Sequence, residues 1–127
     1  MKKIIALAFG LLTLASCDTP QSRFQALTEE FMDQNMTATD RTDVTFGRFD
    51  STANVTPERI TTLHKKANSI PFYKKDIKYS KPTDKLFYST VTYNVTEKDG
   101  KVTKCKQTFY ADYNLTNIVA FMDIPVQ

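Results

Sequence analysis

Three segments near the C-terminus have the residue pattern of β-strands, and in the first two of them apolar and polar residues alternate. These segments run from Lys85 to Thr96, from Lys101 to Asp112 and from Leu115 to Asp123, and they are rich in β-branched and aromatic residues. A turn around Gly100 joins the first two into a hairpin. In the third segment both sets of alternating residues are apolar, so we expect a strand that is covered on both sides.

The turn allows two registers for the hairpin. A two-residue Asp99-Gly100 turn would place apolar side chains opposite charged ones. A three-residue loop, with Gly100 in the left-handed region, instead pairs Tyr93 with Cys105. Because a slip of one residue turns every side chain to the other face, burial favours the second register. One face of the hairpin then carries Phe87, Val91, Tyr93, Val95, Cys105, Phe109 and Ala111.

Two earlier segments carry apolar residues at helical spacing instead. The first runs from about Arg23 to Asn35 and starts with a capping-box pattern, in which Ser22 is the cap and Gln25 follows three residues later. The second starts after Thr56, a capping residue, and Pro57, which suits the first helical position. Its apolar stripe consists of Ile60, Leu63 and Ala67.

Two shorter stretches predict further strands. Residues 42 to 49 alternate in polarity, and Ile77 and Tyr79 alternate within a short edge strand between Pro71 and Pro82. Five lysines surround this second stretch, namely Lys74, Lys75, Lys78, Lys81 and Lys85. We interpret them as charges that protect a strand edge from pairing with another chain. Basic residues interleaved with aromatic ones are alternatively typical of surfaces that bind nucleic acid or anionic polymers.

The predicted order is helix, strand, helix and then four antiparallel strands. We therefore expect an α+β fold, with two helices packed on one face of an antiparallel sheet of four to five strands. This element order resembles that of the cystatin-like and NTF2-like families of small α+β domains. The resemblance implies the fold alone and carries no functional residue across, because the chain has no segment like the Gln-x-Val-x-Gly motif of inhibitory cystatins.

The N-terminus has the parts of a secretory signal peptide. Lys2 and Lys3 precede an apolar run that is too short for a membrane span, which needs roughly 20 residues. The segment Leu14-Ala15-Ser16-Cys17 resembles the lipobox of bacterial lipoproteins. That resemblance implies cleavage before Cys17, a lipid on this cysteine, and a place in the cell envelope facing the periplasm or the cell surface. We expect a signal peptide over residues 1–16, a tether over 17–21 and a single domain over 22–127.

Without the signal segment the chain is close to neutral. It has 17 lysines and arginines against 14 acidic residues, and removal of Lys2 and Lys3 leaves 15 against 14. We therefore expect no nucleic-acid partner. Cys105 is then the only cysteine besides the lipidated one, so no internal disulfide is expected. Its place on the inner face of a strand favours a buried structural cysteine over a reactive thiol.

Residues for common enzyme chemistry are scarce. His64 is the only histidine, and one histidine with one free cysteine gives too few ligands for a zinc site. The three glycines of the chain are too few for a glycine-rich phosphate loop. We therefore expect no catalytic residue, cofactor or metal, and we place His64 at the boundary of the second helix's apolar stripe.

Two classes of function fit these observations. The first is a non-catalytic binding module that holds a protein or glycan partner through Tyr88 and Tyr110 on the outward face of the hairpin, because tyrosine is enriched at interfaces. An inhibitor or immunity-type protein belongs to this class. The second is a small-ligand-binding protein or enzyme of the NTF2-like type, with a pocket between helix and sheet lined by Ser89, Gln107 and His64.

One modification site is also predicted. Asp50-Ser51-Thr52 resembles the short O-glycosylation motif of some bacterial envelope proteins. The motif lies in a predicted loop, which suits modification, so we expect Ser51 to be the acceptor.

Overall fold

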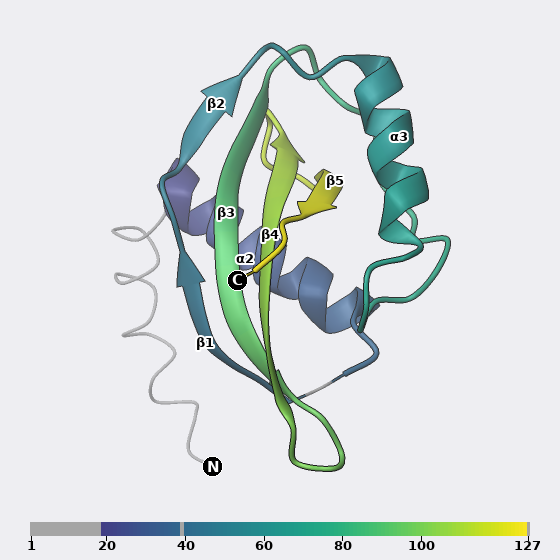
Figure 1. The fold of residues 1–127 in the computed structure, drawn as a ribbon. Coiled ribbons are helices and arrows are strands. Elements are labelled where there is room, and N and C mark those ends of the chain that lie inside the picture. Colours follow the sequence, from purple (N-terminus) through teal and green to yellow (C-terminus); the bar gives the residue numbers. More distant parts are fainter. Residues whose placement is uncertain (1–18, 39, 127) are drawn as a thin grey trace, which may run out of the picture.

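The computed structural model describes residues 19–38 and 40–126. These residues form two helices, α2 (Pro20–Asn35) and α3 (Pro57–Ala67), and five strands. The strands are β1 (Arg41–Phe46), β2 (Asp50–Thr52), β3 (Leu86–Thr96), β4 (Val102–Asp112) and β5 (Ile118–Asp123) (Figure 1). The expected α+β fold is confirmed. Within this part of the chain, no helix is both long and apolar enough to cross a membrane.

The sheet is antiparallel throughout. Its strand order is β1-β3-β4-β5, and β2 also pairs with β3, beyond the end of β1. The β3–β4 hairpin has the register that burial favoured, with Tyr93 opposite Cys105 and Phe87 opposite Ala111. Gly100 in its loop has a φ of 89°, a left-handed conformation that favours glycine.

α3 lies at the edge strand β5 and mainly on the side of the sheet opposite α2, with only Ala67 joining the α2 cluster, although we expected both helices on one face. α2 packs against a cluster that contains Phe109 and Phe121, whereas α3 packs against one that contains Val119 and Ala120. Because successive side chains of a strand point to opposite faces, Ala120 and Phe121 place these clusters on the two sides of β5. The expectation that the last strand is covered on both sides is therefore confirmed.

α2 begins earlier than expected. Thr19 is its N-cap, and the Thr19 hydroxyl accepts a hydrogen bond from the Ser22 backbone N–H at 3.1 Å. The Ser22 hydroxyl in turn accepts one from the Thr19 N–H at 3.0 Å, so Ser22 completes the capping box instead of starting it. Pro20 at the first helical position suits this start, because it has no N–H and its φ is already helical. Pro20 and Gln21, which we expected in the tether, are therefore helical.

Two local expectations were wrong. Residues 71–82 form no strand, and Tyr73 makes only an isolated bridge with Met36. Phe72 and Asp76 have φ values of 71° and 55°, which interrupt an extended backbone. The predicted loop at Asp50 to Thr52 instead forms β2 and pairs with β3.

The expected strand over residues 42 to 49 forms only as far as Phe46, the end of β1, because the chain makes a close approach at Gly47. The Gly47 N–H donates to the Thr90 carbonyl at 2.7 Å, and a Cβ at Gly47 would lie only 3.1 Å from the same oxygen. Glycine therefore allows the chain to turn tightly against β3 at this point.

Candidate functional site

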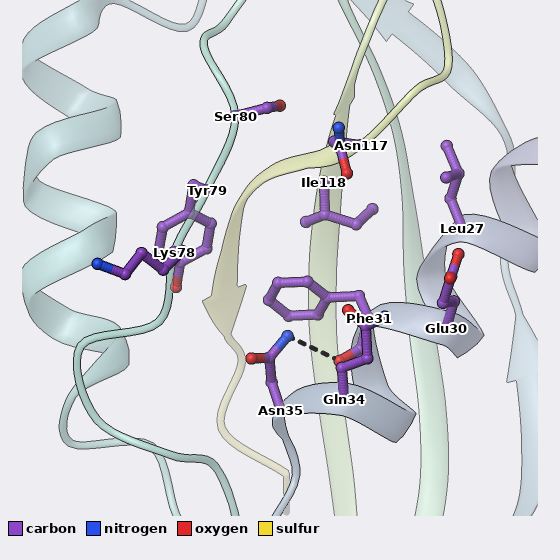
Figure 2. A pocket seen from close by; sticks show the side chains of 10 residues that line it. All are labelled: Leu27, Glu30, Phe31, Gln34, Asn35, Lys78, Tyr79, Ser80, Asn117 and Ile118. Atoms are coloured by element: carbon purple, nitrogen blue, oxygen red, sulfur yellow. Dashed lines mark hydrogen bonds between the residues drawn. The ribbon is translucent and has the colours of Figure 1, made fainter.

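A groove lies between the C-terminal half of α2, the segment 78–80 and the connection into β5 (Figure 2). Its volume is about 480 Å³. We call it the α2 groove; it is lined by Leu27, Glu30, Phe31, Gln34, Asn35, Lys78, Tyr79, Ser80, Asn117 and Ile118. Phe31 and Ile118 are buried and lie between the α2 side and the 78–80 side, whereas Glu30, Gln34 and Asn117 are exposed. The groove therefore has an apolar floor and a polar rim.

Ring stacking holds Tyr79 in the groove wall. Its ring is parallel to the imidazole of His64 on α3, with centroids 3.9 Å apart, and its centroid lies 6.0 Å from that of Phe31 on α2. The His64 Nε2 lies 2.7 Å from the carbonyl oxygen of Val119 on β5. Because a carbonyl only accepts, this nitrogen carries the hydrogen. His64 therefore fixes the irregular 78–80 segment to both α3 and the sheet.

Two hydroxyl groups at the groove are buried without a hydrogen-bond partner among the described residues, the Tyr79 Oη and the Ser80 Oγ. An unsatisfied buried polar group is costly, so each such group calls for a physical explanation. Burial raises the pKa of Tyr79 to about 12, and its hydroxyl is therefore neutral at physiological pH. Both hydroxyls can act as hydrogen-bond donors and acceptors.

Asp112 shapes the connection that supplies Asn117 and Ile118 to the groove. Its carboxylate accepts hydrogen bonds from the Thr116 N–H at 2.8 Å, the Thr116 hydroxyl at 2.6 Å and the Asn117 N–H at 2.9 Å. Burial alone would raise the pKa of Asp112, but these hydrogen bonds outweigh it and the pKa is lowered. The charged form is therefore the one that stabilises the fold.

An Asp112→Asn variant is expected to lose about 1–2 kcal/mol of unfolding free energy at neutral pH, because the amide oxygen can still accept from the two N–H groups but the amide nitrogen cannot accept from the Thr116 hydroxyl, and the charge is lost. A carboxyl with a lowered folded-state pKa contributes stability above its unfolded-state value, near 3.9, and loses it as the pH falls through the folded-state value. Urea unfolding should therefore show that the unfolding free energies of the variant and the unmodified protein become more similar as the pH falls through this acid range. A constant difference at every pH would contradict the role of the charge.

The predicted pocket of Ser89, Gln107 and His64 is not assembled. The Ser89 hydroxyl donates to the Gly47 carbonyl at 3.1 Å, and His64 is engaged with Tyr79 and Val119 on the α3 side. Gln107 is 1% exposed and hydrogen-bonds within a separate network. Each polar side chain thus satisfies a local backbone or side-chain partner, which is the usual state of buried polar groups.

That network joins β3, β4, β5 and the irregular segment. The Gln107 side-chain carbonyl accepts from the Tyr93 hydroxyl at 2.6 Å and from the Tyr73 hydroxyl at 3.3 Å, and the two hydroxyls are 2.9 Å apart. The Gln107 amide nitrogen donates to the Asp123 carboxylate at 2.8 Å. Burial raises the pKa values of Tyr73 and Tyr93, so both remain neutral. The sequence pattern placed Gln107 and Tyr93 on the inner face of the hairpin but did not indicate Tyr73, which lies outside any periodic segment.

Cys105 lies on the inner face of β4, as expected, and is 8% exposed. Burial, followed by the nearby Asp123 charge, raises the pKa of its thiol. Because the thiolate is the reactive form, we expect a maleimide reagent to label Cys105 many times more slowly in the native protein than in urea. A Cys105→Ser variant gives the background labelling that does not come from Cys105. Equally fast labelling in both states would contradict the burial.

Tyr88 and Tyr110 pair directly across β3 and β4, with ring centroids 6.0 Å apart. They lie on the side of the sheet opposite α2, as expected, but both are half-buried. Tyr110 also packs against the α3 cluster, so α3 covers part of this face. The next pairs along the same face are Thr90 with Thr108 and then Thr92 with Lys106. We call this surface the tyrosine face and define it as Tyr88, Thr90, Thr92, Lys106 and Tyr110.

The remaining predicted sites are the O-glycosylation site at Ser51 and the lipid attachment site at Cys17. Ser51 is exposed, but it lies in β2 opposite Phe87 instead of in a loop. Cys17 and the lipobox lie outside the described residues. Within residues 19–38 and 40–126, no group of three or more His, Cys, Asp or Glu side chains is placed to hold a metal ion.

Comparison with known proteins found no match among protein-family models, curated proteins or solved structures.

Proposed function

We propose that this protein is a lipoprotein, anchored to the cell envelope through Cys17, that acts as a non-catalytic binding module for a protein partner. The observation that carries the proposal is the Tyr88–Tyr110 pair on a sheet face that no described helix fully covers. The lipobox resemblance supports the location.

The chemistry of the tyrosine face suits a protein interface. Tyrosine has a large apolar ring and a polar tip, and it is among the residues that contribute most binding energy at such interfaces. The cross-strand contact between Tyr88 and Tyr110 holds the two rings together before any partner arrives. Thr90 and Thr92 keep the surrounding strand polar enough to stay hydrated when the face is empty.

The proposed anchor would hold the domain close to the membrane. Thr19 already caps α2, so only Asp18 separates it from Cys17. An extended chain covers at most about 3.6 Å per residue, which places Pro20 within roughly 11 Å of the lipidated residue. A partner bound at the tyrosine face would therefore be held beside the membrane.

Photocrosslinking in the native envelope tests the interface. We expect a photoreactive residue in place of Thr92, on the tyrosine face, to give a defined crosslinked protein product. The Tyr88→Ala/Tyr110→Ala background should abolish that product. A Tyr113→Ala background is the matched control, because Tyr113 is an exposed tyrosine in the connection after β4.

Tyr110 also packs near α3, so loss of folding must be separated from loss of binding. A Lys106→Glu variant reverses one charge on the tyrosine face without removing a buried side chain. We expect it to weaken the crosslink while the thermal unfolding midpoint stays unchanged. A crosslink that persists in both the double variant and Lys106→Glu would refute the proposed surface.

A further inference from the structure

We propose that the α2 groove is a binding site for a neutral saccharide of one or two sugar rings. This site is separate from the tyrosine face and does not depend on the lipid anchor. Its volume of about 480 Å³ lies within the range of roughly 300–1,000 Å³ that is typical of small-molecule sites.

The polar groups around the groove are mostly uncharged. Gln34, Asn35 and Asn117 contribute amides, and the Asn35 Nδ2 already donates to the Phe31 carbonyl at 2.9 Å. Glu30 contributes a carboxylate, whereas Lys78 directs its ammonium away from Phe31 and Ile118 (Figure 2). A ligand here meets both donors and acceptors together with one negative charge. This combination disfavours an anionic ligand and suits one that is rich in hydroxyl groups.

The apolar floor of the groove suits the C–H faces of a sugar ring. A pyranose ring has hydroxyl groups around its edge and C–H groups on its faces. Phe31 and Ile118 are 8% and 4% exposed, and half-buried Leu27 adjoins them on α2, so together they offer an apolar surface. The exposed amides of Gln34 and Asn117 stand where the edge hydroxyls of such a ring would lie. A purely apolar ligand would leave these amides without partners.

The Tyr79 and Ser80 hydroxyls give the proposal an independent basis. Both are buried at the groove and lack partners among the described residues. The 78–80 segment is held there by the stack of Tyr79 on His64 and Phe31, so the hydroxyls are fixed in place before a ligand binds. A sugar hydroxyl, which both donates and accepts, can satisfy either of them once a small shift of the groove wall opens it to the ligand, because each oxygen is closed to solvent in this structure.

Nuclear magnetic resonance titration of the full-length protein tests the site, in a detergent without a sugar headgroup. The neutral probes are maltose, cellobiose and N,N′-diacetylchitobiose. We expect at least one to shift the side-chain amide signals of Gln34 and Asn117 saturably, with a dissociation constant of about 1 mM. Glycylglycine and spermidine are the comparison probes, for a peptide-like and a cationic ligand.

Two variants separate binding from folding. Tyr79→Phe keeps the ring stack and removes only the unpartnered hydroxyl, so its thermal midpoint should not fall, while saccharide affinity drops about tenfold. Gln34→Ala should weaken binding similarly. Gln21→Ala, an exposed change on the same helix outside the groove, should leave affinity unchanged. The proposal is overturned if no disaccharide shifts these signals, if only glycylglycine or spermidine does, or if Tyr79→Phe binds as the unmodified protein does.

Discussion

Replacing Phe109 with alanine is expected to lower the free energy of unfolding by about 3–5 kcal/mol. Phe109 is fully buried, and its ring is stacked on Phe121 at 5.2 Å and meets Phe31 edge-on at 5.9 Å. The substitution removes one ring of this group and leaves a cavity between α2 and the sheet. Small domains have only about 5–15 kcal/mol of stability in total, so the loss is a large fraction. Urea unfolding measures it.

Val102→Ala is the matched control for Phe109→Ala. Val102 lies on the same strand but is 58% exposed, so its truncation should change the unfolding free energy by no more than about 0.5 kcal/mol. A loss below about 1 kcal/mol for Phe109→Ala would mean that the aromatic group is not the centre of the core.

Replacing Gln107 with methionine is expected to cost about 2–3 kcal/mol, although the side-chain volume is nearly kept. The variant deprives the Tyr93 hydroxyl of its acceptor at 2.6 Å and the Asp123 carboxylate of its donor at 2.8 Å. Tyr93 is buried, so its hydroxyl keeps its desolvation cost without this hydrogen bond, whereas the exposed Asp123 carboxylate can bind water instead. The decrease in the urea unfolding free energy gives the measurement.

A double-mutant cycle shows whether this cost comes from the network. Tyr93→Phe removes the hydroxyl that bonds to Gln107, so Tyr93→Phe and Gln107→Met together should cost clearly less than the sum of the two single changes. Simple additivity would show that Gln107 and Tyr93 act independently, contrary to the hydrogen bonds described.

The hairpin could be predicted from the sequence because residues close to one another in the chain determine its strands and its register. Alternation of polarity defines the two strands, and the position of Gly100 with the burial of one face decides their register. The Tyr88–Tyr110 pair follows directly from that register. The partial cover of Tyr110 by α3 does not, because the side of the sheet on which α3 packs depends on contacts distant in the sequence.

The α2 groove could not be predicted, because tertiary contacts create it. Residues 77–80 alternate like a strand, but the stack of Tyr79 on His64 fixes this segment beside α3 instead. The same limit applies to the buried network, in which Tyr73 comes from an aperiodic segment. Ser89 and Gln107 were correctly placed on the inner face of the hairpin, but their partners there depend on the close approach of Gly47 and on Tyr93.

The proposed lipid anchor places the domain at a membrane, where the tyrosine face would meet its partner. Intact-mass and N-terminal peptide mass spectrometry of the protein from its native envelope tests this anchor most directly. The predicted result is a chain that begins at Cys17 and carries the added mass of acyl chains on that residue. An uncleaved chain that begins at an unmodified Met1 would contradict it.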